Sequence, residues 1–167
     1  MWHQQTLLSC LKLEAGSYNH WMLGKVFGGL EDYAPLLVRL ALAAIFIYAG
    51  LGKVFGAFGG PGLEKTAEYF GPPPAGKLDL PLPILMASLA GIGELGGGFL
   101  VGVGLITRYA AATLCVIMLV ALFAAHGGRL FGDGMSAFTC LVMAVSLLLS
   151  GGGKGSLDRL LKIDERV

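Results

Sequence analysis

The stretch from Pro81 to Arg108 constrains the fold more than any other part of the chain. It is almost entirely apolar, and one carboxylate, Glu94, lies near its middle. A helix rises ~1.5 Å per residue, so about 20 residues cross the ~30 Å hydrocarbon core of a bilayer. A spanning helix would hold Glu94 near the bilayer midplane, where an ionisable group is costly. We therefore expect Glu94 to face protein or water rather than lipid.

The composition indicates an integral membrane protein. Of the 167 residues, 55% are hydrophobic and only 14% are charged, whereas soluble domains carry about 25% charged residues. So few charges cannot cover a soluble surface, and the lipid bilayer is the expected surrounding. The net charge of +1 gives no electrostatic basis for binding nucleic acid.

Hydropathy and turn residues predict an all-α fold, an antiparallel bundle of four transmembrane helices. The membrane domain covers residues 34–150, with spans at about 34–55, 81–105, 109–125 and 135–150. The connection between the second and third spans is so short that these two helices must be antiparallel neighbours. Between the first two spans, glycine and proline breaks bound Leu63–Phe70, which could form a short helix that faces solvent or lies in the interface.

The two ends of the chain differ from this domain. Residues 1–33 mix tryptophans and leucines with charged residues, which predicts an N-terminal arm lying in the membrane interface. Residues 151–167 form a charged tail in which Ser156 is placed to cap a helix. Four spans put both termini on one side, and that side carries eight of the twelve Lys and Arg residues. This bias predicts that both termini are cytoplasmic.

Glycines in the second span occur in two pairs separated by four residues, Gly93 with Gly97 and Gly98 with Gly102. Small residues at this spacing let membrane helices approach closely. Pairs on different faces predict close neighbours on more than one side. A cofactor lying against the glycine face is the alternative.

Arg39, Lys53 and Glu94 are the candidate polar cluster inside the membrane. Arg39 lies about one turn into the first span and Lys53 near its far end, so both side chains could simply reach the headgroups. Alternatively, both could pair with Glu94. Such a cluster is either a structural ion pair or a site for a quinone headgroup or a proton, since carboxylates and cations at membrane depth suit both roles.

Cysteine and histidine give weaker signals. The cysteines Cys10, Cys115 and Cys140 form no CxxC pair, so neither a zinc site nor a disulfide framework is indicated. His126 stands at a helix end and could titrate or bind a ligand. It has no second ligand at metal spacing, and we predict no metal site.

Several short motifs resemble those of the DoxX family over about residues 35–160. Their order along the chain is Arg39, Gly50-Leu51-Gly52-Lys53, Glu94 followed by glycines, Gly104-Leu105-Ile106-Thr107-Arg108, and Gly153-Lys154-Gly155-Ser156-Leu157-Asp158. The resemblance implies a four-helix bundle in a bacterial inner membrane and an association with oxidoreductase assemblies such as thiosulfate:quinone oxidoreductase. It does not by itself imply catalysis.

The resemblance implies a small membrane subunit that anchors or stabilises a larger redox or energy-converting complex without catalysis of its own. Contacts with other subunits are then expected partly through Met1 to Tyr33. The alternative is a quinone-binding subunit that uses Arg39, Lys53 and Glu94, with quinone as the one cofactor considered. A solute or proton transporter is disfavoured because the sequence shows no inverted repeat and no broken helix.

Overall fold

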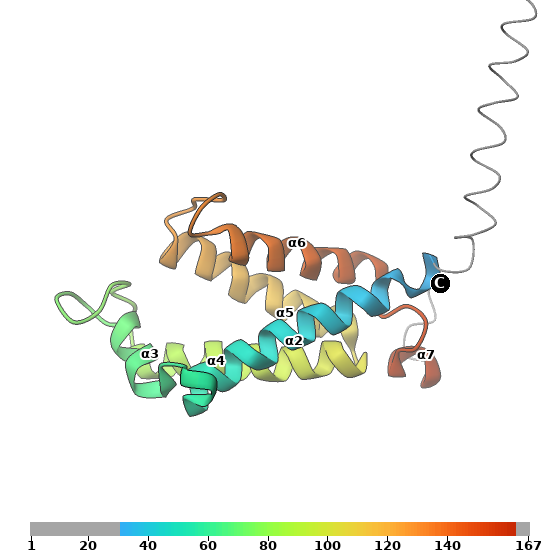
Figure 1. Ribbon diagram of the computed structural model, residues 1–167, viewed down its shortest axis with the longest axis horizontal. Coiled ribbons are helices and arrows are strands. Elements are labelled where there is room, and N and C mark those ends of the chain that lie inside the picture. Colours follow the sequence, from blue (N-terminus) through green and yellow to red (C-terminus); the bar gives the residue numbers. More distant parts are fainter. Residues whose placement is uncertain (1–30, 163–167) are drawn as a thin grey trace, which may run out of the picture. The chain divides into compact units, whose positions relative to one another are not determined.

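The computed structural model describes residues 31–162, and every regular element in that range is helical (Figure 1). The predicted interfacial arm lies outside the described residues except for the short 3₁₀ turn η1 (Glu31–Tyr33). The chain divides into two units, Met1–Ala34 and Pro35–Val167, and the second unit contains the bundle.

The long helices correspond to the predicted spans. They are α2 (Ala34–Phe55), α4 (Pro83–Val103), α5 (Thr107–Val120) with its π-helical continuation η3 (Ala121–Ala125), and α6 (Met135–Ser150). Three of them, with α5 and η3 counted together, are long and apolar enough to cross a membrane. The apolar α6 is shorter, at 16 residues. The prediction of an all-α bundle of apolar helices is confirmed.

Shorter elements connect and close the bundle. They are η2 (Ala57–Gly59), α3 (Gly62–Phe70) and α7 (Leu157–Leu160). The helix predicted between the first two spans is α3, and it ends where Gly71 and a run of prolines follow. The predicted cap of α7 is also present, because Oγ of Ser156 accepts a hydrogen bond from the backbone N–H of Arg159 at 3.3 Å.

The turn between α4 and α5 reverses the chain within three residues. Gly104 adopts a left-handed conformation with φ of 75°, which glycine reaches without a steric penalty. The N–H groups of Gly104 and Leu105 both donate to the carbonyl of Leu100, at 2.9 and 3.0 Å, and so satisfy the end of α4. The two helices are therefore the antiparallel neighbours that the short connection predicts (Figure 1).

One glycine pair of α4 faces α2. A Cβ added at Gly98 would lie 2.8 Å from Cβ of Phe46, and one added at Gly102 would lie 2.9 Å from Cβ of Ala43. No side chain larger than hydrogen fits at such a contact without moving the helices apart.

The other glycine pair faces α5. A Cβ at Gly93 would lie 2.7 Å from Cδ1 of Ile117, and one at Gly97 would lie 2.7 Å from Cδ2 of Leu114. The prediction of close neighbours on more than one side of this helix is confirmed.

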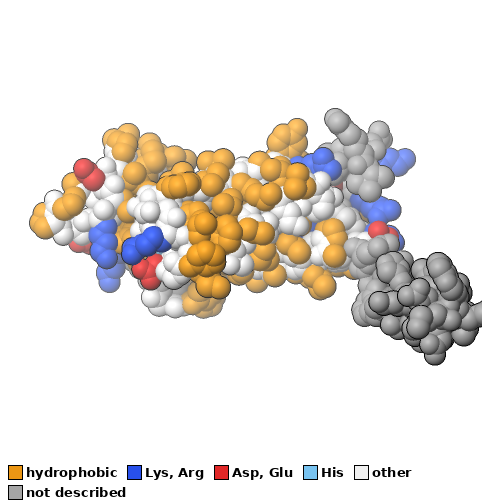
Figure 2. Space-filling model, turned by 90° about the horizontal axis from the view of Figure 1, so that it is seen from above, with side chains coloured by type: hydrophobic (Ala, Val, Ile, Leu, Met, Phe, Trp, Pro, Cys, Tyr) orange, Lys and Arg blue, Asp and Glu red, His pale blue; other side chains and the backbone are white. Residues whose placement is uncertain are grey.

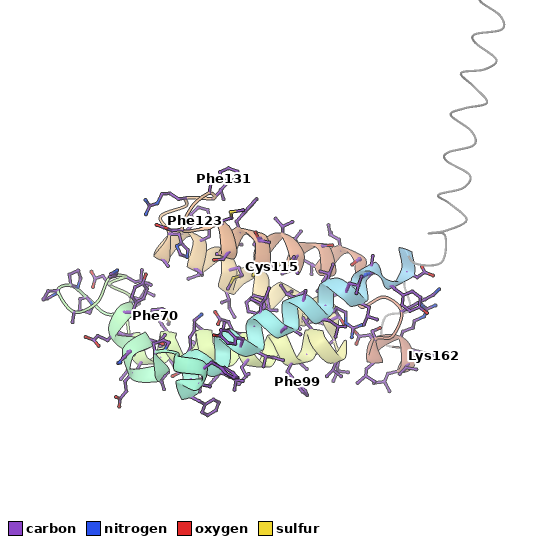
Figure 3. The ribbon with its side chains drawn as sticks, viewed as in Figure 1. Phe70, Phe99, Cys115, Phe123, Phe131 and Lys162 are labelled. Atoms are coloured by element: carbon purple, nitrogen blue, oxygen red, sulfur yellow. The ribbon has the colours of Figure 1, made fainter. Side chains whose placement is uncertain are left out.

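The bundle buries a core of side chains from all four long helices and leaves apolar side chains outside. Leu42, Phe46, Leu114 and Leu147 are almost completely buried. Many large apolar side chains are exposed, including Phe99, which points outward from α4 (Figure 3). Figure 2 shows hydrophobic side chains along the length of the molecule and charged side chains gathered toward its ends. This surface suits lipid rather than water.

Candidate functional site

Lys53 and Glu94 form an ion pair inside the bundle. Lys53 comes from the last turn of α2, and Glu94 from the middle of α4. Nζ of Lys53 donates a hydrogen bond to Oε1 of Glu94. The Glu94 side chain is 2% exposed and the Lys53 side chain 31%. A carboxylate buried this far from water needs a partner of opposite charge, and Lys53 provides it.

Glycine brings these two side chains within reach of each other. Gly91 precedes Glu94 by one turn, and a Cβ there would lie 2.7 Å from Cγ2 of Val54 and 3.6 Å from Cβ of Lys53. The end of α2 thus lies directly against α4 at this level. A larger residue at position 91 would push α2 away and lengthen the distance between the charges.

The second carboxylate oxygen of Glu94 is not used by the ion pair. Oε2 is buried and has no hydrogen-bond partner among the described residues. Buried polar atoms without a partner are rare in folded proteins and each is costly. Oε2 is therefore an acceptor available to a ligand or to water.

The Lys53–Glu94 pair lies on the wall of a cavity of about 670 Å³. Residues of α3, α4, α5 and η3 form most of the remaining wall, and the lining is predominantly apolar. The lining residues with polar or charged side chains are Lys53, Lys65, Thr66, Tyr69, Glu94 and His126. An apolar cavity with a few convergent polar groups is typical of sites for small molecules.

The geometry of α4 and α5 explains where the cavity lies. The two helices are tied together by their short turn and by the glycine contacts near it, and they spread apart toward α3 (Figure 1). Phe70, at the end of α3, lines the space between them (Figure 3). The cavity thus lies where α4 and α5 are farthest apart, and α3 contributes to its wall.

Part of the cavity wall belongs to the outer apolar surface. Leu89 on α4 and Val116 and Val120 on α5 line the cavity, yet they are 58%, 60% and 53% exposed. Because these helices cross the membrane, the cavity is continuous with the lipid-facing surface.

His126 lies on the same cavity as Glu94, which its position in the sequence did not reveal. Ile117 is opposite Gly93, close to the level of Glu94, and His126 follows nine residues later. His126 follows the end of η3 and so lies farther toward the α3 side than Ile117. The cavity therefore runs from the middle of α4 to the end of η3.

The other titratable groups inside the bundle form no metal site. Cys115 and Cys140 are buried free thiols. Among residues 31–162, no three His, Cys, Asp or Glu side chains are grouped so as to hold a metal ion.

Arg39 does not join Lys53 and Glu94, so the structure does not show the three-residue cluster considered from sequence. The residue is 1% exposed, and therefore its side chain does not reach out to the headgroups either. Its Nε donates to the carbonyl of Val101 at 2.9 Å, Nη2 to that of Gly102 at 2.9 Å, and Nη1 to that of Gly152 at 2.8 Å. Arg39 binds here because the last carbonyls of a helix lack partners within the helix, and the end of α4 lies beside Arg39.

Asp158 completes this second polar site. Its Oδ1 accepts from the backbone N–H of Ile106 at 2.5 Å and its Oδ2 from that of Thr107 at 2.8 Å. Its own N–H donates to the carbonyl of Gly104 at 2.9 Å. Asp158 thus caps the start of α5 and holds Ile106, whose φ of 44° is unfavourable for a branched side chain. The terminal cluster, as we name it, consists of Arg39, Gly152, Asp158 and residues 104–107.

The sequence of this protein matches a known family over most of its membrane domain. The DoxX family model matches residues 34–127, which is more than half of the chain. The chain belongs to the DoxX family. It is also 32% identical over 141 residues to the inner membrane protein YqjF of Escherichia coli (strain K12), and the alignment covers 79% of this chain and 95% of that protein. No solved structure matches the chain significantly.

Family membership agrees with the motifs that suggested it, and the structure separates these motifs into two places. Lys53 and Glu94 meet at the cavity. Arg39, the turn at residues 104–107 and the segment ending in Asp158 meet in the terminal cluster. This DoxX protein is an integral membrane protein with one polar site at the middle of α4 and another at the side where α2 begins.

Proposed function

We propose that this DoxX protein is a small membrane subunit of a redox assembly and that its Lys53–Glu94 cavity binds the headgroup of a membrane quinone. One observation carries the proposal. A buried ion pair with a free carboxylate oxygen lies on the wall of an apolar cavity that is continuous with the lipid-facing surface.

The chemistry of the cavity suits a quinone. A quinone ring carries two carbonyl oxygens, which become hydroxyl groups on reduction. The Lys53 ammonium can donate to a carbonyl, and Oε2 of Glu94 can accept from a hydroxyl. The exposed apolar wall formed by Leu89, Val116 and Val120 offers a path for an isoprenoid chain from the bilayer. The cavity volume of about 670 Å³ falls within the range of roughly 300–1,000 Å³ typical of ligand sites.

A purely anchoring subunit, the role implied first by the family resemblance, needs no such cavity. Contacts with partner subunits stay a proposal for residues 1–33, of which 1–30 lie outside the described residues. Both termini of the membrane domain lie on one side of the membrane, which we call the terminal side. The excess of basic residues on that side supports cytoplasmic termini. With that orientation the α3 end of the cavity faces the opposite, periplasmic side.

Photolabelling with an azido-quinone tests the headgroup site. The purified protein in lipid nanodiscs should be labelled on peptides of α4, α5 or η3. Lys53→Met should reduce labelling by the oxidised probe about tenfold, and Glu94→Gln should reduce labelling by its reduced, quinol form by the same factor, since a lost charge-assisted hydrogen bond costs roughly 1.5–3 kcal/mol. Glu64→Gln is the matched control, because Glu64 is an exposed carboxylate on α3 that does not line this cavity.

Two results would contradict the proposal. Equal labelling of the wild-type protein and both cavity variants would make the ion pair a structural feature of an anchoring subunit. Labelling confined to peptides away from the cavity would place any quinone site elsewhere. Circular dichroism and the elution profile must first show that each variant is folded.

A further inference from the structure

We infer that Glu94 is accessible to water and protons from one side of the membrane only, the side on which α3 lies. The cavity and the terminal cluster occupy opposite ends of the bundle. One-sided access to Glu94 does not depend on the identity of the ligand, and so it goes beyond the proposed function.

The α3 side of Glu94 is open. The cavity extends from Glu94 to His126 and is bounded near α3 by Lys65 and Tyr69, both of which are exposed. Polar side chains near the outer end favour the entry of water. The titratable groups that face Glu94 or its cavity are Lys53, Lys65, Tyr69, His126 and, through its electrostatic interaction with Glu94, Cys140 of α6.

The terminal side of Glu94 is closed. Between Glu94 and the end of α4, Gly97 packs against Leu114 and Gly98 against Phe46 at contact distance. Val101 is completely buried at the next level. Interiors packed in this way leave no room for a chain of water molecules.

Beyond this packing, Arg39 adds an electrostatic barrier. Its guanidinium group is held by three carbonyl oxygens, so it cannot swing aside without losing all three hydrogen bonds. A fixed positive charge in a narrow passage opposes the movement of protons and cations. Packing and charge therefore act together on the terminal side, whereas on the α3 side the cavity leaves a path to Glu94.

One-sided access fixes where Glu94 exchanges its proton. Any proton that it gives up or accepts passes between the carboxylate and water on the α3 side, and no electron transfer is involved. If the proposed quinone site is correct, protons bound or released by the headgroup through Glu94 also cross to that side. A subunit of this kind would restrict proton exchange to one side of the membrane without a conformational change.

Cysteine accessibility in sealed vesicles tests the inference. In a full-length background without Cys10, Cys115 and Cys140, we would introduce Ala90→Cys, which lies on the cavity wall one turn from Glu94. Its matched control is Ala111→Cys, at a fully buried position on α5, at a level between Glu94 and Arg39. Lys77→Cys and Lys162→Cys, both at exposed positions, would report which side faces outward.

A membrane-impermeant maleimide should modify Ala90→Cys from the α3 side at least tenfold faster than from the terminal side. Ala111→Cys should react from neither side, although both cysteines should react after denaturation. Reaction of Ala90→Cys at equal rates from both sides, or of Ala111→Cys from the terminal side, would overturn the inference. Failure of Ala90→Cys to react from either side would also overturn it. None of these outcomes depends on quinone, so this inference and the proposed function can fail separately.

Discussion

Arg39 shows how a charged residue can be structural inside a membrane although no salt bridge joins it to another residue of the described part of the chain. All of its described hydrogen bonds go to backbone carbonyls, two at the end of α4 and one in the segment after α6. The carboxylate of Asp158 acts on it electrostatically. Arg39 therefore satisfies acceptors that an apolar side chain would leave unpaired.

Replacement of Arg39 should destabilise the protein strongly. Arg39→Met keeps a similar apolar length but leaves the carbonyls of Gly102 and Gly152 without the donor that Arg39 provides, and that of Val101 with the N–H of Gly104 alone, which should cost about 3 kcal/mol. We expect a large decrease in the melting temperature in detergent, measured as the loss of helical signal in circular dichroism. Arg129→Met is the control, because that side chain is 72% exposed and should contribute less than about 1 kcal/mol. Similar melting temperatures for the two variants would show that the carbonyls find other partners.

The sequence predicted only part of this arrangement. Depth along a helix placed Arg39 and Lys53 at similar distances from Glu94, so it could not distinguish between them. Two features decide the matter. Gly91 allows α2 to approach α4 beside Lys53, and the end of α4 offers free carbonyls beside Arg39. Both depend on how the helices are placed against each other, which no single position in the sequence specifies.

At the scale of elements, α4 is the helix around which its neighbours are arranged. Glycine lowers helix stability by about 1 kcal/mol relative to alanine, yet α4 carries several glycines. The pairs facing α2 and α5 gain closer packing over two faces, which offsets this cost. The sequence predicted this because a spacing of four residues identifies a helix face. It did not predict the π-helical turn η3, for which we find no signal in the residues.

Alanine substitution should distinguish the packed glycines from an exposed one. Gly98→Ala would place a methyl group 2.8 Å from Cβ of Phe46, and overpacking of this kind costs about 1–3 kcal/mol. Gly96→Ala meets no atom within 4 Å and should be neutral or stabilise the helix by up to about 1 kcal/mol. Melting temperatures in one detergent should therefore change in opposite directions or differ clearly. A larger loss for Gly96→Ala would mean that a surface outside this chain packs there.

At the scale of the whole molecule, the residues after α6 belong to the bundle. The sequence suggested a charged tail beyond the membrane domain, and its helix cap at Ser156 was predictable from local chemistry alone. The attachment to the turn at residues 104–107 was not, because Asp158 is about 50 residues away from its partners in sequence. The available signal in the sequence was the position of Asp158, an acidic residue that follows a glycine run and the Ser156 cap. Its hydrogen-bond partners, the N–H groups of residues 106 and 107, could be identified only from the fold.

Removal of this segment should therefore affect the whole protein. Deleting residues 151–167 removes the Gly152 acceptor of Arg39 and the cap on α5, and it should lower stability at least as much as Arg39→Met. Asp158→Ala should have a smaller effect, about 1–3 kcal/mol, because it removes the cap with its two hydrogen bonds and the negative charge near Arg39 but leaves the Gly152 acceptor in place. Asp133→Ala is the control, since that side chain is 80% exposed. Melting temperature and the monodisperse fraction in detergent would be compared. If the deletion left both unchanged, the contacts of Arg39 and Asp158 would be dispensable for folding, and the closed terminal side would have to rest on the packing of α2, α4 and α5 alone.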